Sequence, residues 1–205
     1  MSVPKVFLIG GVHIKEIPKH ILDWKKIDAV LVEGALDNDL LELKNIVREP
    51  LFIIGAYLYF LLLRLIGKDQ KSVYKIRSEH GFRIHSIDVT ITEMVDSFHS
   101  PINYLISTGM FCIVYLLSSS LTSWAHLIYA LVLSSLGYVV YVVLFATLEM
   151  RNKTMARNCV NLIKENKYHI VALSCGYRHI KGIAPLLRKD GLEVVEMNIT
   201  KEGKE

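Results

Sequence analysis

Two histidines follow glycines at matching places near opposite ends of the chain. Gly10-Gly11-Val12-His13 closes the apolar run from Val6 to Ile9, and Gly176-Tyr177-Arg178-His179 closes the run from Ile170 to Leu173. Each segment has the pattern of a strand, a glycine turn and a histidine. Because glycine lets the backbone turn sharply at the carboxyl end of a strand, where α/β folds place their chemistry, we predict that both imidazoles reach one shared site.

A carboxylate is expected at a third strand end, because Glu33 follows the apolar run from Ala29 to Val32. Two neutral imidazoles and one carboxylate are common protein ligands of a catalytic metal site, which keeps an open position for water. A divalent ion lowers the pKa of such a water to about 7 and supplies a nucleophile at neutral pH. We therefore predict that His13, Glu33 and His179 bind a divalent metal ion, with Zn, Mn and Co as candidates.

Two further residues near strand ends have alternative interpretations. Cys175 lies four residues before His179, and a Cys-His pair can act as a nucleophile, but a buried strand cysteine is the simpler interpretation. Asp88 follows another apolar run. Its carboxylate suits either the orientation of a histidine or the capping of a helix that begins near Thr90.

The elements that must position these residues alternate between short apolar runs and helical patterns, which indicates an α/β domain with a central β-sheet and flanking helices. The predicted strands are Lys5 to Gly10, Ala29 to Glu33, Arg83 to Asp88, Ile170 to Cys175 and Glu193 to Ile199. The predicted helices are Ile17 to Lys26, Leu36 to Val47, Leu51 to Ile66, Ser72 to His80, Met150 to Asn166 and Ile180 to Lys189.

The middle of the chain contains no Asp, Glu, Lys or Arg between Asp96 and Glu149. Two apolar segments within it, Ile102 to Leu121 and Trp124 to Leu148, are each long enough to cross about 30 Å of hydrocarbon as a helix. We predict a transmembrane helical hairpin over residues 101–148, which interrupts an α/β domain formed by residues 1–100 and 149–205. The alternative is a buried helical hairpin in a soluble core or a dimer.

A third apolar stretch, Leu51 to Ile66, is interrupted by Arg64 and is shorter than the 17 to 25 residues expected of a span. A third crossing would separate His13 from His179, so we predict a core helix or one at the membrane surface. The hairpin turn lacks Lys and Arg, whereas Arg151, Lys153 and Arg157 follow the second segment. The positive-inside rule therefore places the polar domain of this integral membrane protein in the cytoplasm.

Charge and cysteine content restrict the partners. The 24 basic and 20 acidic residues are scattered along the polar segments, without the basic stripe that binding to a nucleic acid requires. The three cysteines indicate no disulfide framework, which fits a reducing compartment. The lipid bilayer is the partner that the sequence predicts, and packing of the hairpin against a second copy in a homo-oligomer is compatible with it.

These motifs resemble those of the TraB family, which includes the pheromone-shutdown proteins, the Tiki proteases and the GumN group. Those proteins carry an early and a late Gly-x-x-His, an acidic residue after the second strand, and a Glu-Arg-Asn-like segment. The matching residues here are Gly10, His13, Glu33, Arg151-Asn152, Met155-Ala156, Gly176, His179 and Gly182. Two features depart from the family pattern: Tyr177-Arg178 is bulkier, and Glu149 is separated from Arg151 by Met150.

The resemblance implies a metal-dependent hydrolase of peptides, with Glu33 and Arg151 as catalytic groups beside the metal ligands. Arg151 would bind a substrate carboxylate or stabilise an oxyanion. Contact with the peptide would involve Gly10, Gly11, Gly176, Arg151 and Asn152. The leading hypothesis is therefore a membrane-anchored peptidase that limits a peptide such as a pheromone; the alternatives are a non-catalytic peptide-binding or regulatory protein that uses the same cleft, and a structural membrane protein.

Overall fold

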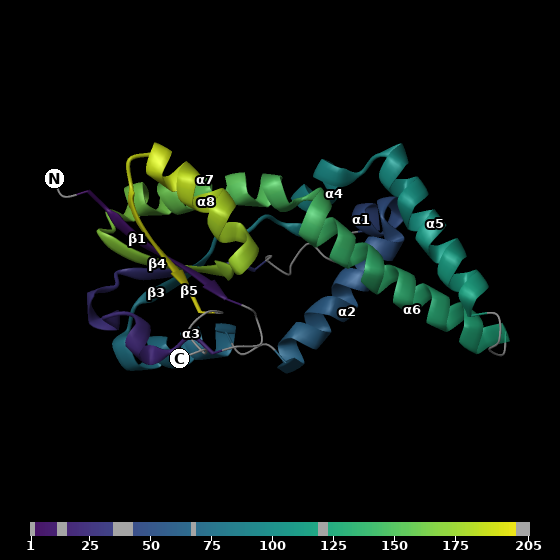
Figure 1. Cartoon of the computed structure of the whole chain (residues 1–205), viewed down its shortest axis with the longest axis horizontal. Coiled ribbons are helices and arrows are strands. Elements are labelled where there is room, and N and C mark those ends of the chain that lie inside the picture. Colours follow the sequence, from purple (N-terminus) through teal and green to yellow (C-terminus); the bar gives the residue numbers. More distant parts are fainter. Residues whose placement is uncertain (1–2, 12–15, 35–42, 67–68, 119–122, 200–205) are drawn as a thin grey trace. The chain divides into compact units, whose positions relative to one another are not determined.

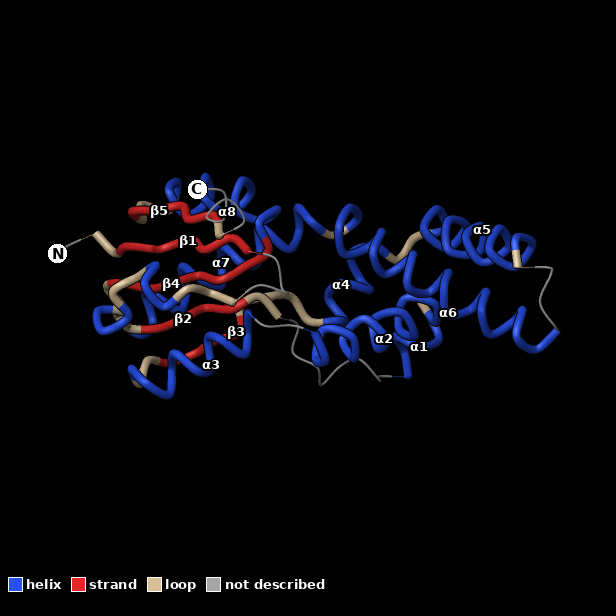
Figure 2. Tube along the Cα trace, turned by 60° about the horizontal axis from the view of Figure 1, so that its bottom comes forward, coloured by secondary structure: helices blue, strands red, loops and turns tan. Residues whose placement is uncertain are grey.

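The computed structural model describes residues 3–11, 16–34, 43–66, 69–118 and 123–199. Within them the chain is an α/β protein built on a parallel sheet with helices around it (Figure 1). The sheet has five strands in the order β3-β2-β4-β1-β5, which can be followed in Figure 2. The strands are β1 Lys5–Gly11, β2 Ala29–Val32, β3 Arg83–Ser86, β4 Ile170–Gly176 and β5 Glu193–Asn198. Each coincides with a predicted strand apart from one or two residues at its end, so the predicted α/β class with a central β-sheet is confirmed.

Most of the predicted helices are also present in the structure (Figure 2). They are α1 Leu43–Arg48, α2 Pro50–Ile66, α3 Asp69–His80, α4 Ile91–Phe98, α5 Pro101–Leu117, α6 Ser123–Tyr141, α7 Leu148–Asn166 and α8 Tyr177–Lys189. A π-helical segment, Val142–Ala146, follows α6. Of the helix predicted over Leu36 to Val47, residues 36–42 lie outside the described part of the chain and the remainder falls on α1.

Central strand β4 pairs with β1 on one side and with β2 on the other. Leu173 aligns with Leu8 and Leu31 in this register, and all three are fully buried in the cluster that includes the apolar faces of α7 and α8. The alternate side chains, including Ile9 and Val30, point into a second cluster with residues of α3. Strands buried on both faces read as continuous apolar runs, which is why they were predictable.

The connection from β1 to β2 differs from the prediction. A helix was expected over Ile17 to Lys26, but the chain forms two short 3-10 turns, Lys19–Ile21 and Trp24–Lys26, with Leu22 extended between them. The extended residue lets Trp24 turn inward, where its ring is 4% exposed and stacks on Phe82. Burial of this large ring over the sheet outweighs the local preference for a regular helix.

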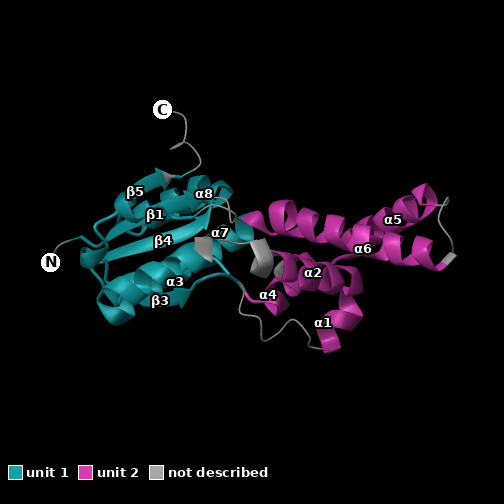
Figure 3. Cartoon of the chain, turned by 90° about the horizontal axis from the view of Figure 1, so that it is seen from below, with its two compact units in different colours: residues 1–35, 66–89, 149–205 teal, residues 36–65, 90–148 magenta. Residues whose placement is uncertain are grey.

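The chain divides into two compact units, which are coloured separately in Figure 3. Unit 1 contains the whole sheet and consists of residues 1–35, 66–89 and 149–205. Unit 2 is helical and consists of residues 36–65 and 90–148. It therefore includes residues 36–65 and 90–100 as well as the predicted hairpin segment 101–148.

Unit 2 is held together by close helix contacts and a buried polar cluster. A Cβ added at Gly55 would lie 2.6 Å from the carbonyl carbon of Ser135, so glycine lets α2 approach the backbone of α6. The carboxylate of Glu49, which is 1% exposed, lies 2.7 Å from His99 Nδ1 and accepts a 3.3 Å hydrogen bond from the Tyr138 hydroxyl. Paired in this way, the carboxylate is tolerated among apolar helices.

Helices α5 and α6 occupy the predicted hairpin region and pack side by side (Figure 3). One described helical stretch, Trp124–Ala146, is long and apolar enough to cross a membrane, with 23 residues and a mean hydropathy of 2.2. A second candidate span requires α4 and α5 to count together, although they are bent by 100° at their junction. Helices of this length and hydropathy also occur in the cores of soluble proteins.

Candidate functional site

The carboxyl ends of β2, β3 and β4 lie at one edge of the sheet in unit 1, because the strands are parallel and adjacent. Glu33 directly follows β2, and its backbone N–H donates to the Ser174 carbonyl at 2.9 Å. Its carboxylate Oε2 accepts a 2.5 Å hydrogen bond from the N–H of Gly176, the residue that precedes α8. The Glu33 carboxylate is therefore buried at the start of α8, where the helix dipole favours a negative charge.

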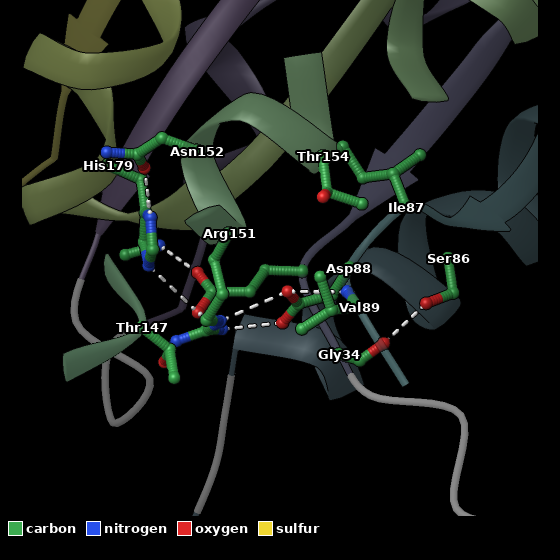
Figure 4. A network of polar contacts seen from close by, with 12 residues as sticks. Gly34, Ser86, Ile87, Asp88, Val89, Thr147, Arg151, Asn152, Thr154 and His179 are labelled. Atoms are coloured by element: carbon green, nitrogen blue, oxygen red, sulfur yellow. Dashed lines mark hydrogen bonds and ion pairs between the residues drawn. The ribbon is translucent and has the colours of Figure 1, made fainter. Parts of the chain in front are cut away.

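Arg151, on the first turn of α7, joins two of these strand ends (Figure 4). Its Nη2 donates to Glu33 Oε1 at 2.6 Å and to Asp88 Oδ2 at 2.5 Å, and its Nε donates to Asp88 Oδ1 at 3.1 Å. The guanidinium is buried. Burial alone would lower the pKa of Arg151, but the attraction of Asp88 and then of Glu33 is larger, so its pKa lies above the ordinary value.

Asp88 was predicted either to orient a histidine or to cap the following helix. The structure gives its carboxylate to Arg151, and Oδ1 also accepts a 2.8 Å hydrogen bond from the Val89 N–H. The cap of α4 is instead Thr90, whose hydroxyl accepts from the Glu93 N–H at 3.1 Å in a capping box. Both sequence interpretations of Asp88 are therefore replaced by an ion pair with Arg151.

His179 lies on the first turn of α8 and is 4% exposed. Its Nε2 is 3.3 Å from Glu33 Oε1, and its Nδ1 is 2.6 Å from Asn152 Oδ1 (Figure 4). Glu33 and His179 follow two different strands and were predicted to meet. In the structure they lie side by side. His13, the third predicted metal ligand, lies outside the described residues, as does the rest of 12–15.

Of the two glycines predicted to turn the chain after a strand, Gly176 does so and Gly10 does not. Strand β1 continues through Gly10 to Gly11, so Gly10 makes no turn. A Cβ at Gly10 would lie 2.7 Å from Ile180 Cγ1, so its missing side chain makes room for α8 on the sheet. Gly176, by contrast, does stand at the junction of β4 and α8, where its N–H binds Glu33.

Asn152 and Gly182 form a contact that the sequence did not reveal. Asn152 was predicted to bind substrate, but in the structure its side chain is buried against His179. A Cβ at Gly182 would lie 2.7 Å from Asn152 Cγ, so glycine provides the space that this side chain fills. The only sequence signal was the position of Gly182 three residues after His179, on the same side of α8.

Cys175 is a buried strand residue in the apolar cluster beneath α7 and α8. Burial raises the pKa of its thiol well above the ordinary value, and the nearby Glu33 carboxylate acts in the same direction. Because the thiolate is the nucleophile, a thiol held in its protonated form is poorly suited to attack. The structure therefore favours the simpler of the two interpretations of Cys175.

A network of opposite charges is the main chemical feature of the cluster formed by Glu33, Asp88, Arg151, Asn152 and His179. Two carboxylates and one guanidinium give it a net formal charge of −1 when His179 is neutral. Such a cluster attracts a cation and can hold an imidazole in a fixed orientation. In the part of the chain that the structure describes, no group of three or more His, Cys, Asp or Glu side chains is placed to hold a metal ion.

No family model matches the chain, and no match was found among curated proteins or among solved structures. The resemblance to the TraB family therefore rests on the motif residues themselves.

Proposed function

We propose that the chain is a membrane-anchored, metal-dependent hydrolase similar to the TraB and Tiki proteins, which cleaves and so limits a peptide such as a signalling pheromone. The observation that carries this proposal is the 3.3 Å approach of His179 Nε2 to Glu33 Oε1 in a buried, negatively charged cluster. These groups come from two separate strand ends, at the edge of the sheet where α/β proteins usually place their chemistry.

The described residues of the cluster provide donor atoms that suit a divalent ion. An imidazole nitrogen and a carboxylate oxygen, the ligand atoms that Zn and related ions prefer, face each other in His179 and Glu33. The net negative charge of the cluster favours a cation. His13 would be the third ligand, and a bound ion would supply an activated water near neutral pH.

The other side chains of the cluster would support this chemistry by fixing the ligands. Arg151 holds Glu33 through Oε1 and Asp88 through both oxygens, so neither carboxylate can rotate without losing a charged hydrogen bond. The Gly176 N–H holds the other oxygen of Glu33. Groups fixed in this way pay little reorganisation cost when charge develops during a reaction.

The membrane anchor of the proposal rests on α5 and α6. Helix α5 has 17 residues and the stretch Trp124–Ala146 has 23, so they are about 26 and 35 Å long at about 1.5 Å per residue. Many of their large apolar side chains are exposed: Ile102, Leu105, Ile113, Leu116, Leu117, Trp124, Leu127, Ile128 and Phe145. A bilayer would cover these side chains, with the Arg151 end of α7 on the cytoplasmic side.

A specific observation favours the second candidate, a peptide-binding or regulatory protein that does not cleave its ligand. Both carboxylate oxygens of Glu33 already accept short hydrogen bonds, from Arg151 and from Gly176. A carboxylate bound on both oxygens can serve as a structural lock between β2, α7 and α8. In that case the cluster would shape a cleft without turning over a substrate.

The experiment that separates the candidates uses the full chain in liposomes, supplied in turn with Zn, Mn and Co and then with a peptide library. The hydrolase should bind metal stoichiometrically and produce new peptide termini, and H179A should lose both properties. The exposed His20 provides a matched control, because H20A removes an imidazole of unit 1 away from the cluster. Peptide binding without new termini under every ion would support the second candidate instead.

A further inference from the structure

We propose that Asn152 is a positioning residue that holds neutral His179 with its proton on Nδ1, so that Nε2 presents a lone pair toward Glu33. This inference deepens the proposed function and rests on it, because a metal-binding imidazole must offer an unprotonated nitrogen. It assigns Asn152 to the orientation of His179, in place of the contact with substrate that the sequence suggested.

The two distances at the ring decide where the proton lies. Nδ1 is 2.6 Å from Asn152 Oδ1, which is a short hydrogen bond, whereas Nε2 is 3.3 Å from Glu33 Oε1. An N–H that donates to a carboxylate is charge-assisted and normally shortens to about 2.7–2.9 Å. The long contact therefore lies on the side without the proton, and the short one on the side with it.

The Asn152 side chain is held between His179 and Gly182, with its amide nitrogen on the side of Gly182 and its oxygen on the side of His179. Asn152 is buried, and its side chain fills the space left by Gly182, whose added Cβ would lie 2.7 Å from Asn152 Cγ. Gly182 follows His179 by three residues on α8, so the amide is held between the histidine and the helix backbone next to it.

The alternative tautomer has its own partner, which makes the role of Asn152 measurable. If the acceptor at Nδ1 is lost, the proton is more stable on Nε2, which lies 3.3 Å from the negatively charged Glu33 carboxylate. Loss of Asn152 should therefore convert one neutral tautomer into the other. A residue that merely filled space would leave the proton where it was.

The test is ¹⁵N NMR of the full chain, labelled at histidine, in detergent micelles without metal. The sample is kept at about pH 8.5, because this is above the ordinary histidine pKa of about 6.5. H179Q identifies the His179 signals. A protonated and an unprotonated ring nitrogen differ widely in ¹⁵N shift, so the spectrum reads the tautomer directly. The wild type should show Nδ1 protonated and Nε2 unprotonated.

Two variants and two controls complete the experiment. N152L and G182A, which remove or displace the acceptor, should move the proton to Nε2. N158L is the control for the first, because Asn158 also lies on α7 but donates to the Ile87 carbonyl at 3.0 Å. G109A is the control for the second, because an added Cβ at Gly109 meets no atom within 4 Å. Both controls should keep the wild-type tautomer.

The outcomes for the tautomer and for the proposed function are distinguishable. A wild-type His179 with its proton on Nε2 overturns the inference, and this result does not depend on whether the variants fold. An unchanged tautomer in folded N152L overturns it as well. Addition of Zn²⁺ tests the function separately: a fixed tautomer without a Zn²⁺-induced shift at Nε2 would leave the role of Asn152 standing and contradict the metal site.

Discussion

Replacement of Arg151 by methionine tests whether the charge network stabilises unit 1. Arg151 is 5% exposed and its Nη2 atom contacts both carboxylates, at 2.6 Å for Glu33 Oε1 and 2.5 Å for Asp88 Oδ2. R151M therefore leaves two buried carboxylates with oxygens no more than about 5 Å apart, whose repulsion is about 3 kcal/mol at an effective dielectric constant of about 20. Removal of one partner of a buried ion pair typically costs about 3–5 kcal/mol.

The matched variant D88N should cost much less, although it affects the same network. It removes one negative charge and leaves the Glu33–Arg151 pair balanced, so we expect a loss of about 1–2 kcal/mol for the weakened hydrogen bonds. R151M should thus lower the free energy of unfolding by about 2 kcal/mol more than D88N. The double variant should cost less than the two single losses together, because D88N removes the repulsion that R151M creates.

The assay is urea unfolding of the full chain in detergent micelles, followed by tryptophan fluorescence. The two tryptophans lie in different units, Trp24 in unit 1 and Trp124 in unit 2. A W124F background makes Trp24, which is 4% exposed, the reporter of unit 1. If R151M costs less than D88N, or under about 1 kcal/mol, the network does not stabilise the fold as argued.

Two further predictions concern the cysteines. Burial raises the pKa of Cys159 to about 12 and that of Cys175 well above its ordinary value, so both thiols stay protonated in the folded protein while those of the unfolded chain ionise. The folded state should therefore lose about 1 kcal/mol per thiol between about pH 9 and 10 in urea unfolding, and C159A and C175A should each remove their own share of this slope. Cys112 on α5 is exposed, so a charged maleimide should label it slowly in nanodiscs if a bilayer covers it, and far more slowly than the water-exposed control K164C. Equal labelling rates would contradict the membrane span.

The sheet was predictable because its strands are buried on both faces. The short apolar runs around Leu8, Val30 and Leu173 are typical of central strands in a parallel sheet, and that is where the structure places them. The 3-10 turns around Trp24 were not predictable, because they allow Trp24 to stack on Phe82, a residue that is distant in the sequence. Local propensity gives way to tertiary packing at such a position.

The site was predictable only where strand ends determine it. Glu33 and the segment from Gly176 to His179 had to meet, because parallel strands end at one edge of the sheet. The ion pair of Arg151 with Asp88 joins a helix to a loop 63 residues away in sequence, and no local pattern indicates it. The contact of Asn152 with His179 was hidden for the same reason, since its only trace in the sequence is a glycine at position 182.

Glu33 is central to both proposed functions. Its carboxylate joins β2 to α7 through Arg151 and to α8 through Gly176, yet one of the same oxygens lies 3.3 Å from His179 Nε2. Each carboxylate oxygen has two lone pairs, so a hydrogen bond from Arg151 leaves Oε1 the capacity for a second partner. A structural lock and a metal ligand are therefore compatible in one residue. The variant E33Q separates the two roles, because an amide keeps one acceptor oxygen but loses the charge that a cation requires. A folded E33Q protein that no longer binds metal would identify Glu33 as a ligand. A folded E33Q protein that still binds metal would leave Glu33 only the structural role.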